Sequence, residues 1–144
     1  NETHLFKGVA GLFCTTKGAL PEVMCYPGQM SQVFMNLIAN AIDALDESFL
    51  QGKYLEDKPK IEITTQATPE SKVAIEIQDN GMGIPEDTQE KIFEPLFTTK
   101  PVGQGTGLGL AIANQIVVER HQGNLQVNSQ MGQGTTFVMD VPLK

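Results

Sequence analysis

The chain has 144 residues, of which 40% are hydrophobic and 19% charged, and it carries a formal net charge of −7. This composition is typical of a soluble globular domain with a sizeable core and excludes a disordered chain. The acidic balance argues against a nucleic-acid partner, because surfaces that bind nucleic acid are normally basic. A polyphosphate ligand would need a divalent cation to screen its repulsion from this chain.

The two cysteines, Cys14 and Cys25, have neither a CxxC spacing nor a nearby histidine pair. That pattern predicts no zinc site and favours a reducing compartment over a disulfide. The sequence contains no apolar run of transmembrane length and no signal peptide. Because the chain begins at Asn1 without a methionine, we expect a cytoplasmic domain cut from a longer parent protein, in which a membrane segment could lie elsewhere.

Hydrophobic periodicity predicts two long helices and several short strands in one domain, residues 1–144. The predicted elements are strands at Leu12–Thr16 and Val23–Cys25, a helix from Gln29 to about Phe49, strands at Ile61–Thr65 and Lys72–Gln78, a short helix opened by Pro85, Glu86 and Asp87, a helix from Leu108 to His121 closed by a C-terminal Gly123, and strands near Leu125–Asn128 and Thr135–Val141. This order predicts an α/β two-layer sandwich, in which helices pack on one face of a mixed, mainly antiparallel sheet.

Asp79 ends a strand whose alternation would turn its carboxylate toward the interior. Val73, Ile75 and Ile77 share one face of that strand, and a period of two continues the face to Asp79. A buried carboxylate needs hydrogen-bond donors, and the glycines at 81 and 83 would allow a ligand to approach closely. The pattern suits a nucleobase with an exocyclic amine, although Asp-Asn-Gly alone could be a simple turn.

In the first long helix, Asn36, Asn40 and Asp43 fall on one face beside the apolar stripe. They could be a solvated polar face, but two amides and an acid aligned in this way favour a site. Amide oxygens are hard ligands that suit Mg²⁺.

Four alternating glycines in Gly103–Leu110 stand at the start of the second long helix. Free backbone amides and the positive end of a helix dipole would bind an anion there, and a flexible hinge is the alternative. The preceding segment, residues 93–107, has no clear period and reads as a lid. Lys100 is its only basic residue and could reach terminal phosphates or simply be solvated. Rossmann, P-loop and protein-kinase motifs are missing from the sequence.

Thr135 repeats the pattern of Asp79, because it shares a strand face with Phe137, Met139 and Val141. Its hydroxyl should point inward and need a partner. Alone it could be a satisfied core threonine, but next to Asp79 it would complete a hydrogen-bonding cradle for a base.

Four motifs in this order resemble the catalytic ATP-binding domain of bacterial sensor histidine kinases, which has the Bergerat fold. The resemblance covers the motif-bearing core, residues 27–142, and its motifs are an N box at Asn36–Ala44, a G1 box at Asp79–Ile84, an F box at Ile92–Phe97 and a G2 box at Gly105–Leu110. Residues 5–20 depart from the family's opening strands, and no phosphoacceptor His-Glu-x-x-Asn motif is present.

The resemblance implies a role for each matching residue. Asp79 would accept the adenine amine, with Thr135 beside it, and Asn40 would hold Mg²⁺. Asn36, Asn40 and Lys100 would be the catalytic residues. The nucleotide site would also contain Asp43, Ala44, Gly81, Gly83, Ile84, Phe93, Thr98, Thr99, Gly105, Thr106, Gly107, Leu108 and Gly109.

Three functions fit these motifs. The first is a kinase domain that transfers the γ-phosphoryl group of ATP to a histidine on a helical hairpin of the same parent protein, and thereby serves a response regulator indirectly. The second is an ATP hydrolase of the gyrase or chaperone type, in which a glutamate stands where this chain has Asn36. An amide cannot act as a general base, which favours the kinase. The third is a non-catalytic nucleotide-binding module. We expect the isolated domain to be monomeric and the parent protein to be a homodimer.

Overall fold

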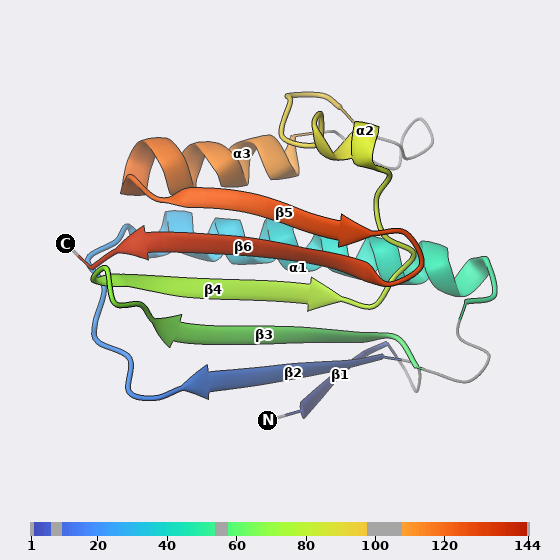
Figure 1. Cartoon of the computed structure of the whole chain (residues 1–144), viewed down its shortest axis with the longest axis horizontal. Helices are drawn as coiled ribbons and strands as arrows, with labels where there is room; N and C mark the ends of the chain where they lie inside the picture. The colour runs from blue at the N-terminus through green and yellow to red at the C-terminus, as the bar shows by residue number, and fades with distance from the viewer. Residues whose placement is uncertain (1, 7–9, 54–57, 98–107, 144) are drawn as a thin grey trace.

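A computed structural model describes residues 2–6, 10–53, 58–97 and 108–143 of the chain. Its strands form a 6-stranded sheet in the order β1-β2-β3-β4-β6-β5. Figure 1 shows α1 behind this sheet and α3 beside it at the β5 edge, and the two helices contact each other, so the described elements make two layers. The elements are β1 (Glu2–Phe6), β2 (Ala10–Lys17), α1 (Pro27–Leu50), β3 (Lys60–Ala67), β4 (Lys72–Asp79), α2 (Glu86–Gln89), α3 (Gly109–Gln115), the π-helical turn η1 (Ile116–Arg120), β5 (Asn124–Gln130) and β6 (Gly134–Pro142).

The sheet is mixed and mainly antiparallel, which confirms the predicted fold class. Strands β2 and β3 pair in parallel, and the other neighbouring strands pair antiparallel. The predicted hairpin is the β3–β4 pair, and the two predicted C-terminal strands are β5 and β6. Strand β6 lies between β4 and β5, and its antiparallel pairing with β4 places the end of β4 beside the beginning of β6.

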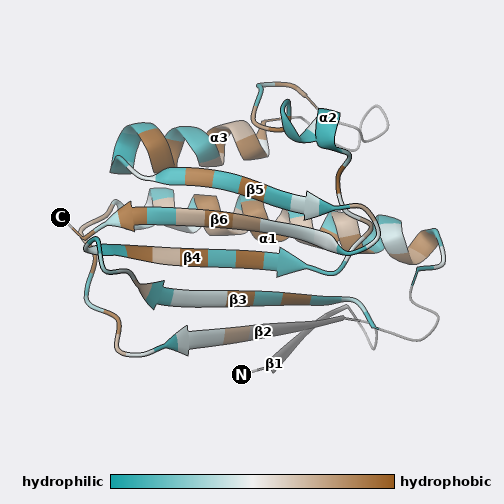
Figure 2. Cartoon of the chain, viewed as in Figure 1, coloured by the Kyte–Doolittle hydropathy of each residue, from teal (hydrophilic) through white to brown (hydrophobic). Residues whose placement is uncertain are grey.

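The inner face of the sheet consists of aligned rows of side chains, because opposed residues of an antiparallel pair point to the same side. Two successive rows across β4, β6 and β5 are apolar, and they are Ile75–Met139–Leu125 and Ile77–Phe137–Val127. The next row is Asp79–Thr135–Ser129. The inner face thus ends in a polar row at the end where β4 stops. The alternation of colours along β4 in Figure 2 shows the same period of two.

Helix α1 covers this apolar face with a buried stripe of Val33, Leu37, Ala41 and Leu45. Their spacing of four residues keeps them on one side of the helix. Full burial of an aliphatic side chain contributes about 1.5–3 kcal/mol, so the stripe holds α1 firmly against the sheet. Pro27 occupies the first turn, where its missing N–H is harmless.

The second long helix differs from its prediction at its end. Its last turn, η1, has π geometry, and the residue with left-handed backbone is Gln122, with φ of 54°. Gly123 closes this helix end as expected, because its N–H donates to the Val117 carbonyl at 2.8 Å. Glycine is also required at position 123, because a Cβ there would overlap the Asp140 carbonyl oxygen. Close packing of the turn before β5 against Asp140 of β6 is thus what excludes a side chain.

The expected strand at Val23–Cys25 is also wrong, because residues 19–26 have no regular structure. Prolines at 21 and 27 flank this segment and limit its ability to pair as a strand. The segment is anchored at Tyr26, whose backbone N–H donates to Nε2 of the buried His121 at 3.0 Å. Nδ1 of His121 donates to the Ile116 carbonyl at 2.9 Å, so the imidazole joins the end of η1 to the start of α1.

Cys14 and Cys25 are free thiols on the surface. Among the described residues, no helix has both the length and the apolar character needed to cross a bilayer. The same residues contain no cluster of three or more His, Cys, Asp or Glu side chains that could hold a metal ion.

Candidate nucleotide-binding site

A cavity of about 530 Å³ lies between α1, the end of β4 and the first turn of α3. It brings together nine of the residues that the sequence assigned to a nucleotide site, namely Asn36, Asn40, Asp43, Ala44, Asp79, Gly83, Ile84, Gly109 and Thr135. This volume is within the usual range for small-molecule and cofactor sites.

Asp79 lies at the inner end of the cavity and is 2% exposed. Burial raises the pKa of its carboxyl group to about 6, although the backbone N–H groups of Gly81 and Thr135 and the charge of Lys53 oppose the rise. The Gly81 N–H donates to Oδ1 at 2.9 Å. When ionised, this carboxylate offers only acceptor oxygens to a ligand.

Two serines hold the turn that follows Asp79. Ser48 of α1 accepts the Met82 N–H at 2.9 Å, and Ser129 of β5 accepts the Ile84 N–H at 2.8 Å. Gly83 has φ of 87°, and a Cβ there would overlap the backbone of Gln130. The turn therefore packs directly on the β5–β6 connection, with its backbone beside the cavity.

A Cβ at Gly81 would lie 2.9 Å from Oδ1 of Asp79 and 3.1 Å from Oγ of Ser48. The lack of a side chain at position 81 therefore leaves room for the hydrogen bond from the Gly81 N–H to the Asp79 carboxylate.

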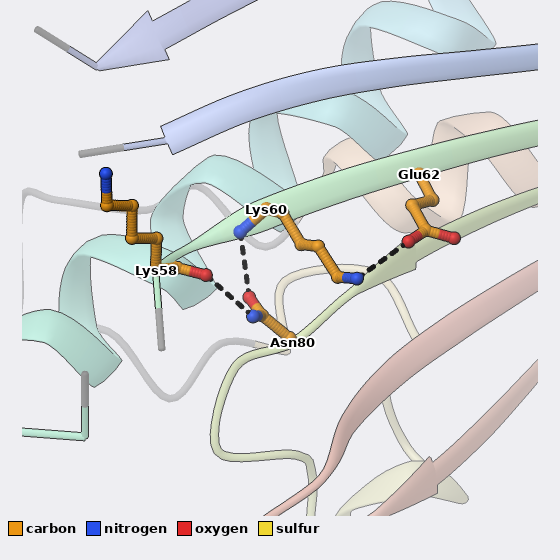
Figure 3. Close-up of polar contacts among 4 residues, drawn as sticks. All are labelled: Lys58, Lys60, Glu62 and Asn80. Carbon is orange, nitrogen blue, oxygen red and sulfur yellow. Dashed lines mark hydrogen bonds and ion pairs between the residues drawn. The ribbon is translucent and has the colours of Figure 1, made fainter. Parts of the chain in front are cut away.

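Asn80 has a structural role on the other side of the turn. Its side-chain Oδ1 accepts the Lys60 N–H and its Nδ2 donates to the Lys58 carbonyl, each at 2.9 Å. Figure 3 shows this side chain directed at the start of β3, where Lys60 also forms an ion pair with Glu62. Asn80 therefore fixes the turn to the neighbouring strand.

The two helix asparagines have different surroundings. Asn36 donates from Nδ2 to the Gly109 carbonyl at 3.0 Å and accepts from Gln32 at 2.8 Å, which ties α1 to the first turn of α3. Asn40 is half-buried one turn further along and also lines the cavity. Within the described part of the chain, we find no protein hydrogen bond to the Asn40 amide.

The cavity wall is acidic. Asp43, Glu47 and Asp79 line it, and no lysine, arginine or histidine does so among the described residues. The described wall alone would therefore repel a polyphosphate. The hard oxygen donors of Asn40 and its acidic neighbours fit a hydrated Mg²⁺, which takes most of its remaining ligands from water and phosphate.

Three described residues of the predicted site do not line this cavity: Gly81, which lies beside the Asp79 carboxylate, and Phe93 and Leu108, which lie elsewhere. Phe93 and Leu108 line a second cavity of about 310 Å³ between the 93–97 turn and α3. Phe93 also contacts Phe137 edge to face, with 6.2 Å between the ring centroids. Ile92 and Phe97 of the predicted F box line the main cavity instead. Thr98, Thr99, Lys100, Gly105, Thr106 and Gly107 lie outside the described residues.

Sequence reasoning missed Ser48 and Ser129. Ser48 continues the spacing of Asn40 and Ala44 along α1, so helical periodicity contained a signal for it. Ser129 lies opposite Thr135 in the β5–β6 register. Only the pairing of those strands reveals that relationship, which a single sequence does not state.

Comparisons with known proteins agree with this geometry. The family model described as histidine kinase-, DNA gyrase B- and HSP90-like ATPase matches residues 26–144. Sporulation kinase E of Bacillus subtilis (strain 168) is 36% identical over 125 residues, which are 87% of this chain and 15% of that protein. Sensor histidine kinase ZraS of Escherichia coli (strain K12) is 39% identical over 129 residues, which are 90% of this chain and 25% of that protein. The chain thus spans a quarter or less of these curated relatives.

Solved structures give the same result. The nucleotide-free catalytic domain of histidine kinase ThkA has a TM-score of 0.75 and 32% identity to this chain, and the match covers 93% of this chain and 79% of that one. ThkA has also been solved in complex with response regulator protein TrrA, with a TM-score of 0.70 and 29% identity over 92% of this chain and 34% of that one. The chain therefore belongs to the histidine kinase-, DNA gyrase B- and HSP90-like ATPase family, and within it to the histidine kinase catalytic domains.

Proposed function

We propose that this domain binds Mg-ATP in the main cavity and transfers the γ-phosphoryl group to a histidine on a separate helical hairpin of the same parent protein. The single observation that carries the proposal is the polar end of the cavity. There a buried carboxylate, Asp79, lies beside the Thr135 hydroxyl, opposite the asparagine face of α1. This arrangement suits an adenine at one end and a metal-bound phosphate chain at the other.

The chemistry of the residues that line the cavity supports a bound Mg²⁺. Asn40 would contribute an amide oxygen to the ion, which would neutralise phosphate charge and orient the terminal phosphate. The acidic cavity wall makes such a cation necessary, because the described wall has no basic side chain to offset the phosphates.

Phosphoryl transfer fits this site better than hydrolysis. Asn36 stands where hydrolytic relatives carry a glutamate, and both polar atoms of its amide already serve contacts to Gly109 and Gln32. An amide cannot remove a proton from water. In transfer, an imidazole nitrogen would form a bond to the γ-phosphorus as the bond to the bridging oxygen breaks and ADP leaves, and positioning supplies most of the catalysis.

We also propose the wider setting of the domain. Residues 1–144 would form one cytoplasmic domain, monomeric when isolated, of a homodimeric parent protein that could be anchored in a membrane. No nucleic acid would bind. The phosphohistidine would in turn supply a response regulator, a role supported by the complex of ThkA with TrrA.

The experiment is radiolabel transfer from γ-labelled ATP. The chain is incubated with a separately expressed hairpin that carries the phosphoacceptor histidine of the parent protein. We expect label on the hairpin in an acid-labile form, and little release of free phosphate by the chain alone. Rapid release of phosphate with no label on the hairpin would instead support the hydrolase.

A further inference from the structure

Ser129 lies behind the proposed adenine site, with its hydroxyl beside Thr135. It is half-buried on β5 and is not among the described residues that line the cavity. Its hydroxyl nevertheless contacts three groups around the cavity's inner end. The Ile84 N–H lies at 2.8 Å, the Gly134 carbonyl at 2.9 Å and the Thr135 hydroxyl at 2.8 Å.

A serine hydroxyl has one proton to donate and two lone pairs to accept with. The Ile84 N–H occupies one lone pair, because an amide can only donate. The Gly134 carbonyl can only accept, so it takes the single Ser129 proton. The remaining lone pair of Ser129 then faces Thr135, and the contact becomes a hydrogen bond only if Thr135 is the donor. Hydrogen positions follow here from satisfying every partner at once.

This assignment uses the only proton of the Thr135 side chain. Thr135 lines the cavity and is 4% exposed, so its hydroxyl turns only lone pairs toward a ligand. Asp79 stands directly opposite Thr135 in the β4–β6 register and, when ionised, also offers only acceptors. The inner end of the cavity therefore presents two acceptors side by side.

We infer that Ser129 is a positioning residue for base selection: by holding the Thr135 proton, it makes the site accept a 6-amino purine and reject a 6-oxo purine. An exocyclic amine has two N–H donors for the two acceptors, directly or through water. A carbonyl at the same position would face lone pairs only. This inference rests on the proposed function, since it concerns how the same site recognises its nucleotide.

The backbone around Ser129 keeps this hydroxyl in place. Gln89 of the short α2 donates from Nε2 to the Ser129 carbonyl at 3.2 Å and to the Ile84 carbonyl at 2.7 Å. The turn after Asp79, the start of β6 and the end of β5 therefore meet at one serine.

The test compares the dissociation constants of Mg-ATP and Mg-ITP, whose base has oxygen in place of the amine. In Ser129→Ala, Thr135 loses its acceptor and its hydroxyl can turn to donate into the cavity. We expect the preference of the wild type for ATP over ITP to fall about tenfold, the value of one hydrogen bond. Ser129→Thr keeps a hydroxyl and should retain the preference.

Ser48→Ala is the matched control. Ser48 also accepts an N–H of the turn after Asp79, and its other hydrogen bond goes to the Ala44 carbonyl rather than to Thr135. This variant should weaken ATP and ITP alike and leave their ratio within about twofold. In a Thr135→Val background, Ser129→Ala should have no further effect on the ratio.

The outcomes separate this inference from the proposed function. A wild type that binds neither nucleotide would overturn both. A wild type that prefers ATP, with an unchanged preference in Ser129→Ala, would overturn only the role of Ser129. If Ser129→Ala does not fold, neutron diffraction from deuterated wild-type crystals decides the matter. The Thr135 deuteron should lie on the line to Ser129, and a deuteron directed into the cavity would contradict the inference.

Discussion

Asp79 combines a cost in folding stability with a proposed role in nucleotide binding. Its carboxylate lies in the polar row of the inner face, with two backbone N–H groups as partners, and burial still raises its pKa to about 6. The rise of the Asp79 pKa from 3.8 to about 6 corresponds to about 3 kcal/mol between the two protonation states. Ionisation of Asp79 at neutral pH therefore costs more free energy in the folded domain than in the unfolded chain.

The first prediction concerns ATP binding and pH. In the proposed site an ionised Asp79 would accept the adenine amine, whereas a protonated one would present a donor, so affinity should fall as pH drops through about 6. Calorimetric titration of Mg-ATP should show about tenfold weaker binding at pH 5 than at pH 7. Asp79→Asn is the control, because the pH dependence of its ATP binding reflects titration of the ligand and of groups other than Asp79. Parallel pH profiles for wild type and variant would exclude Asp79 as the group that titrates.

The second prediction concerns stability. Because the folded pKa of Asp79 lies above the unfolded one, its contribution to stability is fully present below pH 3.8 and is lost as pH rises through about 6. Asp79→Asn should thus be more stable than wild type at pH 8, by up to about 3 kcal/mol, and equal to it near pH 3.8. Urea unfolding at both pH values measures this difference.

Asp46→Asn, at an exposed position of α1, is the control for the stability measurement. Surface substitutions of this kind usually change stability by less than about 0.5 kcal/mol at any pH. A destabilised Asp79→Asn at pH 8 would show that the buried carboxylate gains more from its donors than burial costs.

At the residue scale, the sequence predicted the inward direction of Asp79 and Thr135 because strand alternation is a local property. It did not predict that the Asn36 amide donates to the Gly109 carbonyl, because that hydrogen bond joins two helices far apart in the chain. The position of Phe93 outside the main cavity likewise depends on how the 93–97 turn packs against β6 and α3.

At the scale of elements, two glycines allow β6 to approach its neighbours closely. A Cβ at Gly134, where φ is 123°, would overlap the Asp79 carbonyl oxygen, and a Cβ at Gly123 would overlap the Asp140 carbonyl oxygen. Gly134 begins β6 at the polar row, whereas Gly123 lies at the opposite end of the β5–β6 pair. A substitution at Gly134 should therefore change both stability and the site, whereas one at Gly123 should change stability alone.

The third prediction is that alanine at either glycine destabilises the domain by about 2 kcal/mol or more. Only Gly134→Ala should also lower the affinity of the folded molecules for Mg-ATP, because it displaces the backbone of Asp79. Gly28→Ala, which has open space around it, is the control and should be neutral. Denaturation and calorimetry together provide both values, and equal affinities for the two alanine variants would argue against this coupling.

Periodicity predicted α1, the β3–β4 hairpin and β5–β6 because each has a clean apolar pattern. It failed at residues 19–26, where short apolar groups between prolines imitate a strand. It also missed the π turn at the end of the second long helix, since the 5-residue η1 has the same apolar spacing as an ordinary helix end. Such local geometry depends on packing against α1 and β5 rather than on composition.

At the scale of the whole molecule, negative charge is the main constraint on nucleotide binding. The chain carries −7 overall, and the described wall of the main cavity is acidic as well. ATP adds further negative charge, so binding without a divalent cation would bring like charges together in a partly desolvated site. The composition alone predicted this requirement, and the cavity wall shows where the repulsion would act.

The most direct test of this account is calorimetric titration of ATP into the wild type at pH 8, with Mg²⁺ and then with a chelator, and into Asp79→Asn with Mg²⁺. We predict binding with Mg²⁺, a large loss of affinity when the ion is removed, and a loss of about 2 kcal/mol or more in Asp79→Asn. ATP binding of unchanged strength in Asp79→Asn, with that variant folded, would contradict the assignment of the buried carboxylate as the adenine acceptor.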